Sequence, residues 1–226
     1  IKKFSGKRIG VNYDSISVSG FNRMKKNLKA RFIDASGMLA ELRTVKRRDE
    51  IENIKKACGI TDNIYKKIFR DAKGMRTEHE MKNTIEEMMR DYNVVPSFEV
   101  IVASGKNGAN PHHASGNNKL KGMTVIDIGV KVKNYCSDMT RTICFGNQKR
   151  EELHAYHLIK SVQDRCIKMT RSGENFNVIN RYAWNSIGKK MMHNVGHGLG
   201  IDVHEAPFVS KEKAKSILKE GSVITI

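Results

Sequence analysis

Residues 124–145, TVIDIGVKVKNYCSDMTRTICF, constrain the fold more than any other stretch of the chain. Apolar residues fill two arms around a short polar turn. β-Branched and aromatic residues on both sides of such a turn predict a β-hairpin. Each arm also contains one acidic residue, Asp127 in the first and Asp138 in the second. The hairpin therefore places two carboxylates within otherwise apolar strands.

The register of the hairpin decides how the two aspartates meet. A turn at Val132 and Lys133 would set them directly opposite each other, and a turn at Lys133 and Asn134 would make them diagonal neighbours on one face. In either register the carboxyl groups are about 5 to 8 Å apart, and like charges at that separation repel each other. Four interpretations stay open: a metal ion between the two carboxylates, one carboxyl group that is neutral, an aspartate exposed at a strand end, or a bulge that turns one aspartate to the other face.

A second polar stretch, residues 193–205 (HNVGHGLGIDVHE), places three histidines among three glycines. Glycines at this density disfavour a helix and suit a backbone that passes close to an ion or a substrate. Imidazole and carboxylate groups together are ordinary ligands of Zn, Mn, Fe and Co. We interpret the three histidines as candidate functional residues, and His112 with His113, in a Gly-, Asn- and Ser-rich loop, as a further pair.

Composition excludes several classes of protein. The net charge of +17 raises the option of a nucleic-acid partner, but the basic residues are spread along solvated helix faces without a recognition motif, so we expect none. The four cysteines form no CxxC pair and are too sparse for a disulfide scaffold, which predicts reduced thiols and a cytoplasmic protein. No apolar run approaches the roughly 20 residues of a membrane span.

Hydrophobic periodicity predicts the remaining elements. Strands at 8–12 and 30–35 flank a helix within 15–28 and form a β-α-β fragment. Further helices are expected at 37–42, 48–73, after Thr77, and at 151–171, 175–187 and 210–220, with strands at 97–103, 189–193 and 223–226. Two α-α-β units of this kind would pack as a curved antiparallel sheet with helices on its outer face, which is an α+β architecture.

Three segments resemble the motifs of a known family. In order, IVASGKNGANPHH, VIDIGVKVKNYCSDMTRTI and HNVGHGLGIDVHEAP closely resemble those of the pita-bread metallopeptidases, the family of creatinase, prolidase and methionine aminopeptidase. The likeness is closest to the proline-specific members, prolidase (Xaa-Pro dipeptidase) and aminopeptidase P. It implies a pita-bread catalytic domain over residues 43–226, preceded over residues 1–42 by the C-terminal part of a smaller α/β domain of the creatinase and prolidase type.

The resemblance also implies a set of metal ligands. Asp127 corresponds to a carboxylate that chelates one metal ion, Asp138 to a carboxylate that bridges two ions, and His197 to the imidazole ligand. Two divalent metal ions are therefore expected as cofactors, Mn or Co, with Zn or Fe as alternatives. Such ions activate a water molecule and polarise the carbonyl of a peptide bond.

The other histidines are expected to act on the substrate. By the same resemblance, His112, His193 and His204 match residues that position the peptide carbonyl and stabilise the tetrahedral intermediate. The implied activity is hydrolysis of Xaa-Pro bonds in short peptides, by a protein that forms a homodimer and has no membrane partner.

The chain departs from the family pattern at its end. The family supplies two further glutamate ligands after the histidine run, the first of them directly after the position of Ile226. Because the chain stops at Ile226, we expect a fragment with three of five protein ligands, inactive by itself. The alternatives to a proline-specific peptidase are a methionine aminopeptidase and a non-enzymatic binding module with a basic surface.

Overall fold

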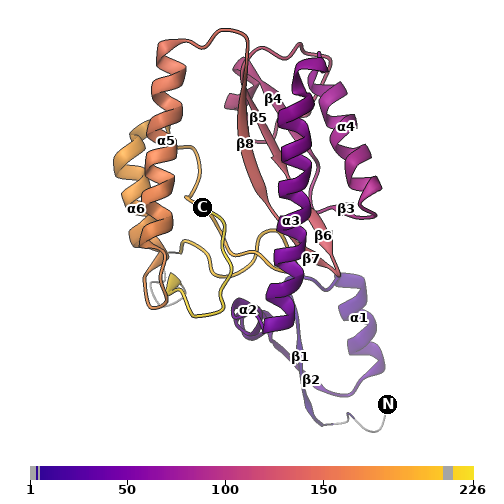
Figure 1. The fold of residues 1–226 in the computed structure, drawn as a ribbon. Coiled ribbons are helices and arrows are strands. Elements are labelled where there is room, and N and C mark those ends of the chain that lie inside the picture. The colour runs from indigo at the N-terminus through magenta and orange to yellow at the C-terminus, as the bar shows by residue number, and fades with distance from the viewer. Residues whose placement is uncertain (1–3, 5, 211–215) are drawn as a thin grey trace.

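The computed structural model describes residues 4, 6–210 and 216–226. Its helices are α1 (Val18–Asn27), α2 (Ser36–Thr44), α3 (Arg48–Asp71), α4 (Glu78–Asp91), α5 (Arg150–Met169) and α6 (Phe176–Ile187), with 3-10 turns η2 (Ala72–Gly74), η3 (Gly105–Ala109) and η4 (Gly188–Lys190). Its strands are β1 (Arg8–Val11), β2 (Arg31–Asp34), β3 (Val95–Pro96), β4 (Ile101–Ser104), β5 (Gly122–Ile128), β6 (Val130–Val132), β7 (Tyr135–Cys136) and β8 (Met139–Phe145). Figure 1 shows their arrangement.

The β-α-β fragment expected at the start of the chain is confirmed. Strands β1 and β2 pair in parallel, and α1 forms the crossover between them. Phe21 on α1 fixes the helix to the strands, because its ring lies 5.2 Å from that of Tyr13 and 5.5 Å from that of Phe32, edge to face in both cases. This fragment lies at one end of the molecule (Figure 1).

Helices α3 and α4 pack side by side against the antiparallel sheet β4-β5-β8 (Figure 1). Helical spacing predicts buried positions for Met81 and Ile85 of α4 and for Ile64 and Ile68 of α3, and all four side chains are buried. The sheet contributes Ile126 and other buried residues to the same core. This core is the rigid base from which the candidate site is built.

The predicted hairpin forms, with its turn at Lys133 and Asn134. Both turn residues have positive φ angles, 49° and 68°, which is the backbone of a two-residue type I′ hairpin turn. Val132 therefore pairs with Tyr135, and the same register continues into the pairing of β5 with β8. The diagonal arrangement of the two aspartates follows from this turn.

Helices α5 and α6 form a second layer with a core of its own. Val162 and Cys166 of α5 pack against Phe176 and Ile179 of α6. Helical spacing predicts that Leu158 and Ile159 face inward on α5, and this prediction is wrong in part, because Leu158 is 39% exposed and Ile159 is 49% exposed. Amphipathic spacing marks one face of the helix, but the described part of the chain covers these two side chains only in part.

The three elements predicted at 189–193, 210–220 and 223–226 do not form as regular helices or strands within the described residues. The strand expected at 189–193 is wrong, because the chain forms the turn η4 there and Met192 is 59% exposed. The strand expected at 223–226 is reduced to an isolated bridge between Ile224 and Gly198. The helix expected at 210–220 lies partly outside the described residues, and within them Ile217 bridges Asn175.

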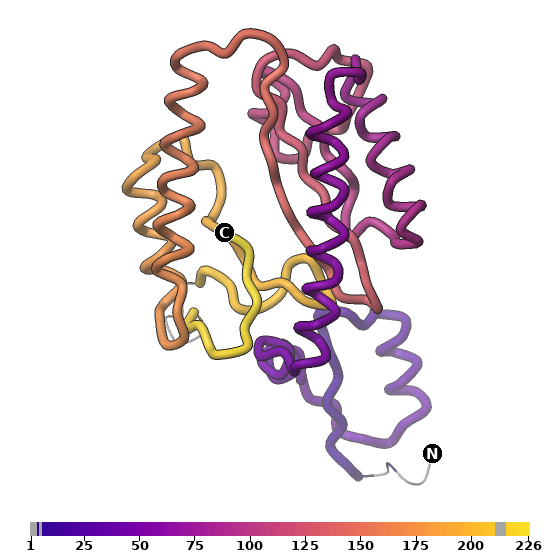
Figure 2. The backbone as a smooth tube through the Cα atoms, in the orientation of Figure 1, coloured from indigo at the N-terminus to yellow at the C-terminus, as the bar shows by residue number. Residues whose placement is uncertain are grey.

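The described residues after η4 are 191–210 and 216–226, and the end of this segment near Ile226 lies between the α5 and α6 pair and α3 (Figure 2). The backbone N–H of Cys136 donates to the carbonyl of Gly200 at 2.8 Å, so the tip of the hairpin holds this segment. Among the described residues, none of the helices has the length and hydropathy needed to cross a lipid bilayer. Helices packed on antiparallel sheets confirm the predicted α+β class.

Candidate metal centre

An interruption of the hairpin places Asp138 at the candidate site. Gly129 lies at this interruption, where a Cβ atom would come within 2.0 Å of the Ser137 carbonyl oxygen and 2.2 Å of the Ser97 hydroxyl, so only glycine fits. The Ser137 hydroxyl accepts a hydrogen bond from Val130 N–H at 2.9 Å. Asp138 follows directly and lies between β7 and β8, outside either strand.

Asp127 lies on β5, opposite Thr140 of β8. The Thr140 hydroxyl donates a hydrogen bond of 2.8 Å to the Asp127 carboxylate. Burial, and after it the charge of Asp138, raise the pKa of Asp127 to about 6, although the bond from Thr140 acts in the opposite direction. The two carboxylates therefore repel each other, which is the condition that a bound cation would relieve.

The histidine loop, residues 193–205, forms a close-packed turn, and the prediction that it is not a helix is confirmed. Its backbone is held on two sides, by Gly198 N–H donating to Pro207 O at 2.8 Å and by Leu199 N–H donating to Val223 O at 3.0 Å. At Gly198 a Cβ atom would lie 2.3 Å from the Glu205 carbonyl oxygen. The glycines thus permit the close approach that fixes the loop.

His197 is the imidazole that points at Asp138. Its Nε2 lies 3.4 Å from Oδ2 of Asp138, and its Nδ1 lies 3.1 Å from the Gly198 carbonyl oxygen. A proton on Nδ1 would satisfy that carbonyl and leave Nε2 free as a metal ligand. Burial alone lowers the pKa of His197, but the bonds to Asp138 and Gly198 raise it overall.

His204 completes a compact group of donors. Its ring lies edge-on to that of His197, with centroids 4.2 Å apart. Burial, followed by the charge of His197, lowers the pKa of His204. One donor atom from each of Asp138, His197 and His204 lies within 4.8 Å of the others.

This donor set suits a divalent metal ion. Carboxylate oxygen and imidazole nitrogen are the ligands that Mn, Co, Zn and Fe share in proteins. Asp127 stands next to the trio and carries a repelled charge of the same sign as Asp138. The chemistry of these side chains therefore fits a metal ion, because the lone pairs of Asp138, His197 and His204 converge and two neighbouring carboxylates carry excess negative charge.

His112 and His193 lie at the exposed edge of this cluster. Nδ1 of His193 is 2.8 Å from the Asn194 carbonyl oxygen. The charge of His193 is close enough to lower the pKa of Asp127, and that of His112 to lower the pKa of His204. The fold therefore gathers all six predicted site residues from three separate segments, which are the loop that carries His112, the hairpin and the histidine loop.

Three residues near the cluster were not predicted. Thr140 bonds to Asp127, Glu205 anchors the histidine loop to Lys46 at 3.0 Å, and Glu78 contacts the loop that carries His112. The alternation of β8 could have found Thr140, because it places that residue on the Asp127 face. The two glutamates leave no such signal, because their partners are far away in the sequence.

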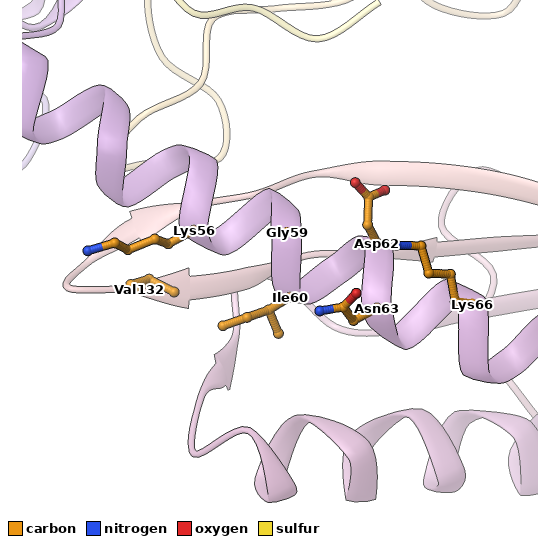
Figure 3. A pocket seen from close by; sticks show the side chains of 7 residues that line it. All are labelled: Lys56, Gly59, Ile60, Asp62, Asn63, Lys66 and Val132. Atoms are coloured by element: carbon orange, nitrogen blue, oxygen red, sulfur yellow. The ribbon is translucent and has the colours of Figure 1, made fainter.

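A cavity of about 510 Å³ lies against α3, and none of the six predicted site residues lines it (Figure 3). It is lined by Lys56, Gly59, Ile60, Asp62, Asn63, Lys66 and Val132. In Figure 3 the Asp62 carboxylate points away from Ile60 and Asn63. Because these polar groups do not converge as a binding site requires, we place the chemistry at the aspartate and histidine cluster.

Comparison with known proteins assigns both parts of the chain. Residues 52–226 match the model of metallopeptidase family M24. Residues 1–45 match the model of the creatinase/prolidase N-terminal domain.

Curated relatives show the same likeness. The chain is 34% identical over 217 residues, 92% of its length, to an uncharacterized peptidase of Staphylococcus aureus. It is 31% identical over 210 residues, 89% of its length, to the Xaa-Pro dipeptidase of Pyrococcus furiosus. The chain spans 60% of the length of each of these two relatives.

Solved structures share the fold. The prolidase of Thermococcus sibiricus superposes with a TM-score of 0.87 at 35% identity, over 99% of this chain and 63% of that one. The X-Pro aminopeptidase of Thermotoga maritima superposes with a TM-score of 0.85 at 30% identity, over 96% of this chain and 64% of that one. These likenesses confirm the predicted pita-bread fold. The chain belongs to metallopeptidase family M24.

Proposed function

We propose that the protein hydrolyses the peptide bond between an amino acid and a following proline, with the aspartate and histidine cluster as its active site. Two kinds of support meet here. The fold brings a carboxylate and two imidazoles within 4.8 Å of one another. Two of the similar proteins are described as a prolidase and an Xaa-Pro dipeptidase.

The proposed metal ligands are Asp127, Asp138 and His197, holding two divalent ions, Mn or Co. When bound, such ions act as Lewis acids toward the peptide carbonyl and lower the pKa of a coordinated water. Asp127 and Asp138 supply the negative charge that holds the ions. The Gly198 carbonyl, through Nδ1 of His197, keeps Nε2 of that ring directed at Asp138.

The proposed role of the other histidines is to orient the substrate. Because the pKa of His204 is lowered, its imidazole is neutral near neutral pH and offers one N–H to a peptide carbonyl. Donors fixed in position before the reaction stabilise the charge that develops on that oxygen. His112 and His193, at the exposed edge, would contact the peptide as it enters.

The experiment is a metal-dependence assay on the full-length protein with Xaa-Pro dipeptides. We expect cleavage stimulated by Mn²⁺ or Co²⁺ and abolished by Asp138→Asn, which keeps the size of the side chain and removes its charge. Asp164→Asn is the matched control, because Asp164 lies on α5 and pairs with Lys160 at the surface. It should leave the rate unchanged.

Several results would argue against this function. Absence of cleavage with every divalent metal tested would reject it. Cleavage of a peptide with amino-terminal methionine, but not of Xaa-Pro peptides, would favour a methionine aminopeptidase. Tight DNA binding that weakens steeply with salt would favour a basic binding module.

We also propose a domain boundary between residues 42 and 43. The two family models support a division close to this point, because they cover residues 1–45 and 52–226 and so leave residues 46–51 as the link. Limited proteolysis that released a stable product beginning before α3 would test it.

A further inference from the structure

Glu78, in the first turn of α4, is a fully buried carboxylate outside the metal cluster. Its exposed fraction is 0%. A charged group in such a position is costly unless hydrogen bonds replace the water that it loses. The hydrogen-bond partners of Glu78 therefore indicate its role in the fold.

All of its hydrogen bonds run to one loop. Oε1 accepts from Ser104 N–H at 2.7 Å and from the Asn107 side chain at 2.9 Å. Oε2 accepts from the backbone N–H of Gly116 and the Asn118 side chain, both at 3.2 Å, and lies 2.8 Å from Nε2 of His113. A single carboxylate thus binds residues 104–118 at both ends and in the middle.

The charge of this carboxylate is required. An ionised glutamate is an acceptor only, with room for four or more hydrogen bonds, whereas a neutral acid or an amide must turn a donor toward some of the same N–H groups. Burial opposes ionisation, but the bonds from Asn107, His113 and Ser104 together lower the pKa of Glu78 to about 2. Glu78 is therefore an anion throughout the neutral range.

The backbone around Glu78 also forms hydrogen bonds with the loop 104–118. The N–H of Glu78 donates to the Asn118 carbonyl at 3.0 Å, and the N–H of His79 donates to the Gly116 carbonyl at 2.8 Å. These two N–H groups belong to the first turn of α4, where they have no partner within the helix, and the loop carbonyls accept their hydrogen bonds. The loop is thus docked on the helix start by its main chain and by the buried carboxylate.

This loop carries His112, whose side chain is exposed and has no hydrogen bond among those found for the described residues. The adjacent His113 is held, with a side chain only 15% exposed. The two adjacent histidines therefore have different roles: His113 anchors the loop, and the side chain of His112 stays available to contact a ligand. The charge of His112 already acts on His204 across the cluster.

We infer that Glu78 is a positioning residue that, through His113 and the loop 104–118, holds His112 where it contacts the substrate. The inference rests on the proposed peptidase function. Fixing a contacting group in advance saves the entropy of ordering it when substrate binds, and a misplacement of about 1 Å can cost roughly 100-fold in rate.

The test is a double-mutant cycle in the full-length protein. Glu78→Gln is expected to lower kcat/KM for an Xaa-Pro dipeptide by about 10- to 100-fold, with the affinity for Mn²⁺ changed by less than about threefold. In a His112→Ala background, Glu78→Gln should cause little further loss, because residues that act through one another are non-additive. Glu87→Gln is the control, since Glu87 is an exposed residue of the same helix.

A milder variant covers the case in which Glu78→Gln fails to fold. His113→Ala removes one anchor, and its loss of kcat/KM should also vanish in the His112→Ala background. His113→Gln should recover part of the rate, because its amide can donate to Glu78. Additive losses, unchanged activity, or a parallel loss of Mn²⁺ affinity would overturn the inference.

Hydrogen exchange separates this inference from the proposed function. In the wild type, the amides of Ser104 and Gly116 should exchange slowly, and Glu78→Gln should speed both by at least about tenfold, because the acceptor that protects them is lost. This result is expected even if no peptide is cleaved. Unchanged exchange would show that Glu78 does not hold the loop.

Discussion

Asp127 illustrates how a single residue can report on the site. Its ordinary pKa of 3.8 is raised to about 6, first by burial and then by Asp138. Between these two values the folded protein binds more protons than the unfolded chain, so the stability of the metal-free protein falls as pH rises through this window. Above pH 6 the full repulsion is present.

We therefore expect Asp127→Asn to increase the free energy of unfolding of the metal-free protein, relative to the wild type, by more at pH 7.5 than at pH 4. The difference is on the order of 2 kcal/mol, because one pKa unit corresponds to about 1.4 kcal/mol. Denaturant unfolding of both proteins across this pH range measures it. A difference that does not depend on pH would contradict the shifted pKa. Titration with Mn²⁺ offers a second check, since binding below pH 6 should release fewer protons from the variant than from the wild type, which loses the proton of Asp127 in addition to that of His197.

At the scale of elements, the histidine loop is tied to the link before α3 by a buried ion cluster. Glu205 is 7% exposed in its side chain and pairs with Lys46, which is 2% exposed, at 3.0 Å. Glu205 also pairs with Arg43, and Arg43 reaches Asp202 at 2.7 Å. Burial lowers the pKa of Lys46, and Glu205 counteracts that effect. The loop next to His204 thus depends on charges from the start of the domain.

Glu205→Gln is expected to destabilise the protein by about 3 kcal/mol, because it leaves the buried Lys46 without a negative partner. Asp202→Asn is the matched control. The Asp202 side chain is 62% exposed, and exposed pairs contribute less than about 1 kcal/mol. Denaturant unfolding of the wild type and the two variants measures both losses of stability. Equal losses for Glu205→Gln and Asp202→Asn would contradict the larger contribution of the buried pair.

At the scale of the whole molecule, the proposed ligands come from both halves of the chain. Asp127 and Asp138 belong to the hairpin, whereas His197 belongs to the segment that follows α5 and α6. Each half has its own apolar core. A bound metal would therefore add a further link between two units that also meet at Cys136 and Gly200 and through the ion pair of Lys46 with Glu205.

Mn²⁺ should raise the melting temperature and bring the unfolding of the two halves together. Trp184 is the only tryptophan in the chain and lies on α6, so its fluorescence reports on the second half, while circular dichroism reports on both. At a metal concentration 100 times Kd the stabilisation is about 2.7 kcal/mol. Asp138→Asn should abolish the effect. If the fluorescence and circular dichroism melting curves of the wild type remain different with saturating Mn²⁺, the metal does not link the two halves.

The sequence by itself determined the elements whose signals are local. The 3.6-residue spacing of Ile64 and Ile68, the β-branched arms of the hairpin and the glycines of the histidine loop each follow from the conformation of neighbouring residues, so α3, β5 and the loop were predictable. The motif order also identified the family. The two possible registers of the hairpin remained equal until the turn at Lys133 and Asn134 was seen.

Only the tertiary structure decided which residues act together. Glu78 and His113 are 35 residues apart, and Lys46 and Glu205 are farther still, so no periodic pattern connects them. The exposed face of α5 and the absence of a strand at 189–193 have the same origin, because amphipathic spacing shows that a face can be buried but not what lies against it. Hydrogen bonds and ion pairs between distant segments replace lost water, and the fold alone determines which segments meet.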